Sequence, residues 1–122
     1  VYPPFLGYAL ERIQRKYSPG PIYMTENGCA MIDRVDEQGR VHDLWRQEYL
    51  RTHIDQLLLM KQNGVDIAGY FAWSLLDNFE WQYGYSKRFG LIRVDYDTQE
   101  RTMKASGEWY QSCLKDRKLY TR

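Results

Sequence analysis

The chain has 122 residues, of which 17 are Lys or Arg and 16 are Asp or Glu, so its formal net charge is +1. This composition is typical of one globular domain at most, without the run of about 18 apolar residues that a membrane span requires. The balanced charge, with no basic block, argues against a nucleic-acid-binding surface, whereas the 16% of aromatic residues exceeds what a small core needs.

The first predicted element is a helix over residues 6–17, in which apolar side chains recur at helical spacing. Residues 18–21 (Ser-Pro-Gly-Pro) end it, because no helix continues through such a segment. Residues 22–25 are a short, mostly apolar run without polar alternation, which predicts a strand covered on both faces, as in a parallel sheet. Residues 26–28 (Glu-Asn-Gly) follow with the residue types of a turn.

The next predicted unit is a charged loop, a helix and a second strand. The loop spans residues 29–42, and Asp43 is a suitable N-cap for a helix that continues to residue 62. The predicted apolar face of this helix includes Leu50, Ile54, Leu57 and Leu58. Residues 65–74 (VDIAGYFAWS) predict a second strand. Strand, helix and strand in this order form a right-handed βαβ crossover, and therefore an α/β fold with a parallel sheet.

The remaining residues contain an aromatic and acidic stretch (75–85), a predicted hairpin with arms at 89–95 and 100–102, and a closing helix at 104–114. Two parallel strands have open edges, and both of their faces require cover. The pattern therefore requires neighbouring elements from outside this chain.

Carboxylates and indoles follow the predicted strands at the ends where parallel sheets bind ligands. Glu26 follows the first strand, Trp73 lies near the end of the second, and Glu80 and Trp81 lie on the next loop. Pyranose rings stack their C–H faces on aromatic rings and their hydroxyls bind carboxylates, so this set is suited to a sugar. The alternatives of a solvated turn residue for Glu26 and a core residue for Trp73 stay open at this point.

Other classes of site have no counterpart in the sequence. We find no Gly-rich phosphate loop, no paired-cysteine motif and no serine-hydrolase or zinc-protease motif. His42 and His53 have no suitably spaced partner, so we assign no metal ion and no cofactor. Cys29 and Cys113 are expected to be free thiols in a reducing compartment. Since residues 1–4 do not resemble a signal peptide, we expect a cytoplasmic location.

Two segments resemble a known family. Residues 22–28 (IYMTENG) are similar to the nucleophile motif Ile-Thr-Glu-Asn-Gly of glycoside hydrolase family 1, the β-glucosidases and their relatives. Residues 64–96, which contain GYFAWSLLDNFEW and GYSKRFGL, and the terminal residues 104–110 resemble the C-terminal region of the same family. The resemblance implies a (β/α)8 TIM barrel, with residues 22–25 as its seventh strand and residues 67–74 as its eighth. Residues 1–122 would then be the C-terminal part of a single barrel, comprising its last two βα units and a β-hairpin, and not a complete domain.

The resemblance also implies a role for each site residue. Glu26 would be the catalytic nucleophile of a retaining mechanism, forming a covalent glycosyl-enzyme. Trp73 would be the platform under the nonreducing sugar, Glu80 would accept hydrogen bonds from its 4- and 6-hydroxyls, and Trp81 would donate one to its 3-hydroxyl. Phe89 would help to form the wall of the pocket. In the family members that act on phosphorylated sugars, the position of Glu80 resembles a serine. Glu80 therefore favours unphosphorylated glucosides, fucosides or galactosides as substrates.

One part of the family pattern is missing. A retaining glycosidase needs two carboxyl groups about 5–5.5 Å apart, and the acid/base motif Thr-x-Asn-Glu-Pro of this family does not occur in the chain. A complete barrel also needs about 250 residues. We therefore expect the chain to be inactive alone and to require the N-terminal part of the barrel as its partner, with a β-glucoside or related oligosaccharide as substrate. The alternatives are a non-catalytic sugar-binding or structural fragment and a relative of the phospho-β-glycosidases.

Overall fold

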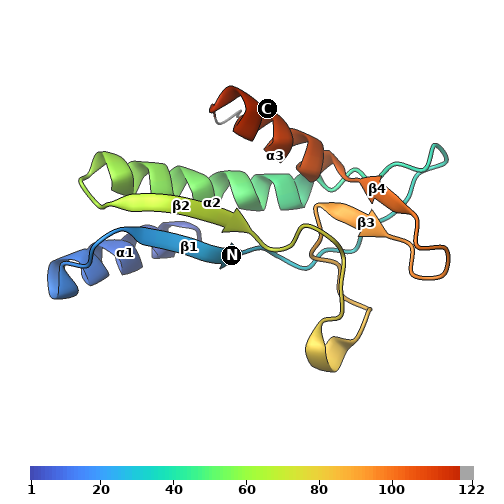
Figure 1. The fold of residues 1–122 in the computed structure, drawn as a ribbon, viewed down its shortest axis with the longest axis horizontal. Helices are drawn as coiled ribbons and strands as arrows, with labels where there is room; N and C mark the ends of the chain where they lie inside the picture. Colours follow the sequence, from blue (N-terminus) through green and yellow to red (C-terminus); the bar gives the residue numbers. More distant parts are fainter. Residues whose placement is uncertain (119–122) are drawn as a thin grey trace.

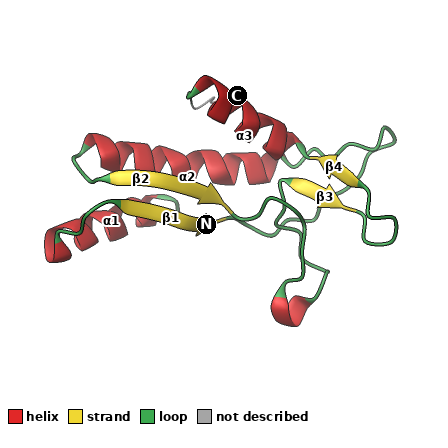
Figure 2. Ribbon diagram, viewed as in Figure 1, coloured by secondary structure: helices red, strands yellow, loops and turns green. Residues whose placement is uncertain are grey.

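The computed structural model describes residues 1–118, which form three α-helices, a short 3-10 helix and four strands (Figure 2). The elements, in chain order, are α1 (Pro4–Tyr17), β1 (Ile22–Asn27), α2 (Leu44–Gln62), β2 (Ile67–Ala72), the short 3-10 helix η1 (Trp81–Tyr83), β3 (Ile92–Val94), β4 (Arg101–Met103) and α3 (Ala105–Asp116). None of the helices in this range has the length and hydrophobicity of a membrane span.

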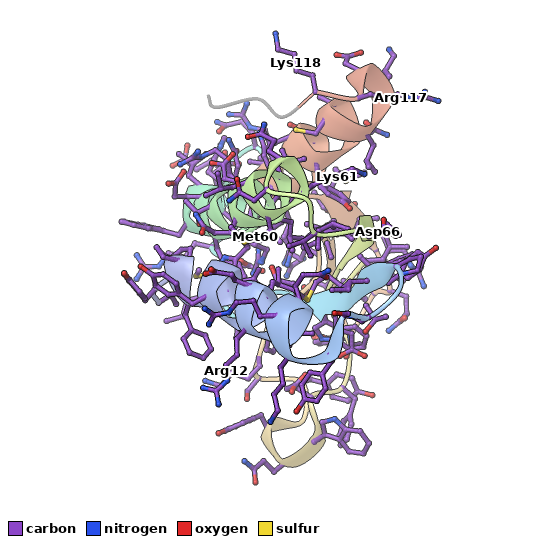
Figure 3. All side chains as sticks on the ribbon, turned by 90° about the vertical axis from the view of Figure 1, so that its left-hand side faces the viewer. Arg12, Met60, Lys61, Asp66, Arg117 and Lys118 are labelled. Carbon is purple, nitrogen blue, oxygen red and sulfur yellow. The ribbon has the colours of Figure 1, made fainter. Side chains whose placement is uncertain are left out.

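The strands β1 and β2 pair in parallel, and α2 connects them, as the sequence predicts. Helices α1 and α2 lie side by side against one face of this sheet, and α3 packs on α2 (Figures 1 and 3). The strands β3 and β4 pair antiparallel in a separate small sheet beyond the end of β2. The boundaries differ from the prediction at one important place: β1 continues to Asn27, so Glu26 lies inside the strand and not in a turn.

Two apolar clusters form the core between the helices and the sheet. The first joins α1, α2 and both strands around Leu10, Leu57 and Ile67. Figure 3 shows Met60, a member of this cluster, between α2 and α1, while Arg12 points from α1 away from α2. The second cluster joins α2 and α3 and consists of Leu50, Leu91, Trp109 and Cys113.

The buried face of α2 differs from the predicted one. It comprises Arg46, Leu50, His53, Leu57 and Met60, which recur at helical spacing. The predicted face was wrong at Leu58, whose side chain is 43% exposed because it lies outside this stripe. Asp43 does occupy the N-cap position, but its side chain makes no capping hydrogen bond and is used in tertiary contacts instead.

One face of the sheet is open within the described residues. Tyr23 of β1 and Phe71 of β2 are each 57% exposed, and both rings lie close to the place that a Cβ atom of residue 69 would occupy. Both helices pack on the same face, so residues 1–118 do not provide the cover that the sequence analysis requires for the other face. Within the same described residues, each strand of the pair also has one unpaired edge. An open apolar face and two open edges are what a segment of a larger sheet presents.

Candidate active site

The carboxylate of Glu26 lies at the carboxyl end of β1, on an exposed side chain. Within residues 1–118 it has no hydrogen-bond or ion-pair partner. A carboxylate at the end of a parallel strand, with no structural partner, is free to contact a ligand. The reading of Glu26 as a turn residue is thus wrong, since the residue belongs to the strand.

The segment after Glu26 is held closely against the end of β2. The backbone N–H of Trp73 donates to the carbonyl of Asn27 at 2.8 Å. A Cβ atom at Gly28 would lie 1.8 Å from the carbonyl oxygen of Trp73, so only glycine permits this approach. Gly28 is therefore required for close backbone packing, and this packing brings Glu26 and Trp73 to the same edge of the sheet.

Trp73 and Phe89 are neighbours at this edge. The side chain of Trp73 is 38% exposed, which differs from the alternative of a fully buried core residue. The backbone N–H of Ser74 donates to the carbonyl of Phe89 at 3.3 Å, and Leu91 donates to the carbonyl of Ser74 at 2.8 Å. These bonds place the half-buried Phe89 beside the end of β2.

Glu80 and Trp81 lie on a loop that projects from the sheet (Figure 1). The loop is closed by two backbone hydrogen bonds: the N–H of Glu80 donates to Gly84 at 2.7 Å, and the N–H of Tyr83 donates to Glu80 at 2.8 Å. The indole of Trp81 is 81% exposed. In the described part of the chain, neither side chain has a protein partner, and no hydrogen bond joins them to Glu26. The structure therefore places Glu26, Trp73 and Phe89 at the carboxyl ends of the two strands, whereas Glu80 and Trp81 lie on the separate projecting loop.

Aromatic rings support the base of this loop. Phe79 and Tyr85 meet edge-to-face with ring centroids 5.5 Å apart, and Tyr85 contacts Tyr96 at 4.5 Å. The guanidinium of Arg88 lies over the ring of Tyr96 at 4.3 Å. The stack connects the projecting loop to the charged residues behind it.

Those charged residues form a buried network that the sequence analysis missed. We call it the buried ion-pair network, and it contains three carboxylates and three cations: Asp33, Asp43, Asp77, Arg46, Arg88 and Lys104. Arg46 is paired with both Asp33 and Asp43, and Lys104 is paired with both Asp33 and Asp77. Because the charges balance, the network satisfies groups that would be costly to bury alone.

Asp77 links the network to the site, since it lies three residues before Glu80. Its carboxylate, which is 0% exposed, accepts from Lys104 at 2.8 Å, from Arg88 at 2.9 Å and from the backbone N–H of Gly90 at 2.9 Å. Burial alone would raise the pKa of Asp77, but these hydrogen bonds and the Lys104 charge outweigh it and hold the pKa below its usual value. Asp77 is therefore an ionised anchor for the base of the loop.

A signal for this network was present in the sequence. Arg46 falls at the helical spacing of Leu50 and Leu57, which places a charged side chain on the buried stripe of α2. A buried charge requires a partner, and Asp43 lies one helical turn before it. The long-range partners, by contrast, have no local pattern.

The two histidines contact other groups of the protein, and the two cysteines form no disulfide. His53 contacts the carbonyl of Tyr49 at 2.7 Å, and His42 contacts the carboxylate of Asp36 at 3.0 Å. Both Cys29 and Cys113 are free thiols, and burial raises the pKa of Cys29 to about 11. Among residues 1–118, no cluster of three or more His, Cys, Asp or Glu side chains is arranged to hold a metal ion.

Comparisons with known proteins identify the family of the chain. The family model described as "Glycosyl hydrolase family 1" matches residues 1–119. The chain is 50% identical over 119 residues to the 1,4-beta-D-glucan glucohydrolase of Thermotoga neapolitana and to Beta-glucosidase A of Thermotoga maritima, each match covering 98% of this chain and 27% of the relative. It is 47% identical to the Bifunctional beta-D-glucosidase/beta-D-fucosidase of Bifidobacterium breve, over 95% of this chain and 26% of that protein.

Solved structures give the same result. The family 1 β-glucosidase from Thermotoga maritima superposes with a TM-score of 0.96 at 49% identity, over 98% of this chain and 27% of that one. The same enzyme was also solved in complex with isofagomine lactam and with glucoimidazole.

The fold is that of one part of a (β/α)8 glycosidase barrel, as predicted. The chain belongs to glycosyl hydrolase family 1. It spans about a quarter of the length of the relatives that it matches.

Proposed function

We propose that the chain contributes the nucleophile and part of the sugar-binding site to a retaining β-glycosidase that hydrolyses β-O-glycosidic bonds. The single observation that carries this proposal is the exposed carboxylate of Glu26 at the carboxyl end of β1, without a partner in residues 1–118. The family to which the chain belongs, and the relatives named as glucosidases, support the reaction class.

In the first step, the carboxylate oxygen of Glu26 bonds to the anomeric carbon while the bond from that carbon to the leaving-group oxygen breaks. The leaving-group oxygen takes a proton from an acid/base carboxyl outside this chain. In the second step, that carboxylate removes a proton from a water molecule, whose oxygen attacks the anomeric carbon and releases Glu26 as a carboxylate. The acid/base group has to lie about 5–5.5 Å from Glu26 for this sequence.

The sugar would stack on Trp73, with Phe89 beside it. The carboxylate of Glu80 would accept hydrogen bonds from the 4- and 6-hydroxyls, and the indole N–H of Trp81 would donate to the 3-hydroxyl. The lack of a protein partner for the Glu80 side chain in residues 1–118 supports a role in binding ligand hydroxyls. An acidic group at this position favours an unphosphorylated sugar, since a phosphate would be repelled.

We propose that residues 1–122 act as the C-terminal part of a single barrel, whose remaining part supplies the acid/base. The open face with Tyr23 and Phe71 and the two unpaired strand edges support such a partner. The isolated chain is then expected to be inactive. The cytoplasmic location expected from the sequence stays a prediction.

A chimera tests the proposal directly. Residues 1–119 replace the matching region of Thermotoga maritima Beta-glucosidase A, so that the other part of the barrel comes from the relative. We expect the chimera to hydrolyse an aryl β-glucoside and to be labelled on Glu26 by a fluoro-glucoside inactivator, with the labelled peptide identified by mass spectrometry. The Glu26→Gln chimera is expected to lose both properties.

The other outcomes assign the alternatives. A folded chimera that binds glucose but neither turns over nor becomes labelled would support a non-catalytic sugar-binding role. Stronger competition by a phosphorylated glucoside than by its parent sugar would indicate a phospho-β-glycosidase. Labelling at a residue other than Glu26 would refute the nucleophile assignment.

A further inference from the structure

The residue after the proposed nucleophile has an unusual environment. The amide of Asn27 lies between two tyrosine hydroxyls from different elements: Tyr70 of β2 donates to its Oδ1 at 2.8 Å, and its Nδ2 donates to the hydroxyl of Tyr49 of α2 at 3.3 Å. We call these three side chains the Tyr70–Asn27–Tyr49 chain. It connects β1 to its neighbouring strand and to the helix packed behind both.

The hydroxyl of Tyr70 acts as a donor to Asn27, and the hydroxyl of Tyr49 acts as an acceptor. Burial raises the pKa of Tyr70, and burial also raises that of Tyr49, so both hydroxyls keep their protons. With Tyr70 as donor, the amide oxygen of Asn27 faces Tyr70 and its NH₂ group faces Tyr49, which fixes the orientation of the amide. The bonds run in one direction along the chain and polarise one another.

The register of the sheet changes at this place. Met24 pairs with Tyr70, and Asn27 pairs with Ala72, so two residues of β1 stand between these pairs where β2 has one. An extra residue in one strand is a β-bulge, which re-aims side chains and is frequent beside active sites.

The bulge accounts for the direction of Glu26. Met24 packs into the core cluster beneath the helices, and Asn27 bonds to α2, so both face the helices although they are three residues apart. In a regular strand, residues three apart face opposite sides. Thr25 and Glu26 between them are both exposed, as expected if the bulge turns both toward the open face.

We propose that Asn27 is a positioning residue for glycosyl transfer to Glu26: the Tyr70–Asn27–Tyr49 chain locks the bulge that aims the Glu26 carboxylate into the sugar site. The inference rests on the proposed function of Glu26. Asn27 does not touch the sugar, because its side chain lies on the helix side of the sheet. Its loss therefore slows the covalent step without weakening binding of the sugar.

The test uses the chimera described above and separates binding from reaction. For the Asn27→Ala chimera, the rate constant for covalent labelling by the fluoro-glucoside is expected to fall between about 10- and 100-fold, the effect of a displaced reacting group. Two measures of binding are expected to change less than about 3-fold: the concentration of inactivator that gives half of the maximal rate, and the inhibition constant of glucose. The reason is that Asn27 does not contribute to binding of the sugar in the ground state.

A second variant applies if Asn27→Ala does not fold. Tyr70→Phe keeps the ring and the amide and removes only the donor to Oδ1, and we expect the same split with a smaller loss. Tyr110→Phe is the matched control, because Tyr110 contacts Tyr70 edge-on at 6.4 Å but is not part of the hydrogen-bonded chain.

The outcomes separate this inference from the proposed function. If the unchanged chimera is not labelled on Glu26, the proposed function fails. If it is labelled, and Asn27→Ala and Tyr70→Phe react at its rate or weaken glucose binding as much as they slow labelling, the positioning role is refuted. An equal loss in Tyr110→Phe would refute it as well.

Discussion

Replacing Lys104 by methionine tests whether the buried ion-pair network stabilises the fold. Methionine has a similar length but no charge, and the Lys104 side chain is 0% exposed. Its removal takes a cation from two carboxylates at once. Asp77 keeps Arg88 at 2.9 Å and the N–H of Gly90, whereas Asp33 keeps, among residues 1–118, only Arg46 at 3.0 Å.

The expected cost follows from this imbalance. Removing one partner of a buried ion pair destabilises a protein by about 3–5 kcal/mol, because a charge is left without compensation. We expect Lys104→Met to lower the free energy of unfolding by that amount. The double variant Lys104→Met with Asp33→Asn removes the carboxylate with the fewest remaining partners, so it is expected to lose about 1–3 kcal/mol less than the two single losses added together.

The assay is unfolding of the chimera in guanidinium chloride, monitored by tryptophan fluorescence, with the free energy of unfolding extrapolated to water. Lys115→Met, on an exposed position of α3, is the control and is expected to change the free energy by no more than about 0.5 kcal/mol. A loss below about 1 kcal/mol for Lys104→Met, the value of a surface pair, would refute the reasoning. Simple additivity in the double variant would also contradict it.

Three further predictions concern the site and its support. Gly28→Ala is expected to lower the free energy of unfolding by about 3 kcal/mol or more, because its Cβ would lie 1.8 Å from the carbonyl oxygen of Trp73. Gly20→Ala is the control and should leave the free energy nearly unchanged in the same assay, because its Cβ would have no atom within 4 Å. Because the pKa of Asp77 is held low, its ionised form stabilises the fold above about pH 4, and this stabilisation is lost as the pH falls through the lowered pKa. Asp77→Asn should therefore flatten the decline in the free energy of unfolding between about pH 5 and about pH 2. An unchanged slope would contradict this reasoning. Glu80→Gln is expected to lower kcat/KM for an aryl glucoside about 10- to 100-fold through loss of charged hydrogen bonds, with a smaller loss for an aryl xyloside that lacks the 6-hydroxyl; equal losses would argue against the assigned contact.

The sequence predicted the parallel βαβ unit because its signals are local. Continuous apolar runs, helical spacing and Gly or Pro stops each act over a few residues, and the resulting strands and helices are found where expected. The end of β1 was misjudged because Glu26, Asn27 and Gly28 have turn chemistry, yet pairing with β2 overrides it.

The contacts behind the site were not predictable in the same way. The amide of Asn27 meets Tyr70 at a separation of 43 residues, and Lys104 meets Asp33 at a separation of 71. Such contacts depend on the folded geometry, and no spacing in the sequence predicts them. Only Arg46, a charge on an apolar helical stripe, gave a local sign that a buried partner was needed.

The long reach of Lys104 has a consequence for biosynthesis. Asp33 and Asp77 leave the ribosome well before Lys104, which joins them from 71 and 27 residues further along the chain. Until α3 docks, their shared cation is absent, and closing a loop of this length carries an entropic cost. Since Lys104 has to be synthesised before it can pair with Asp77, the base of the loop that bears Glu80 and Trp81 gains this ion pair only after residue 104 is in place. The order of translation thus places this contact after those that Asp77 makes with Arg88 and Gly90.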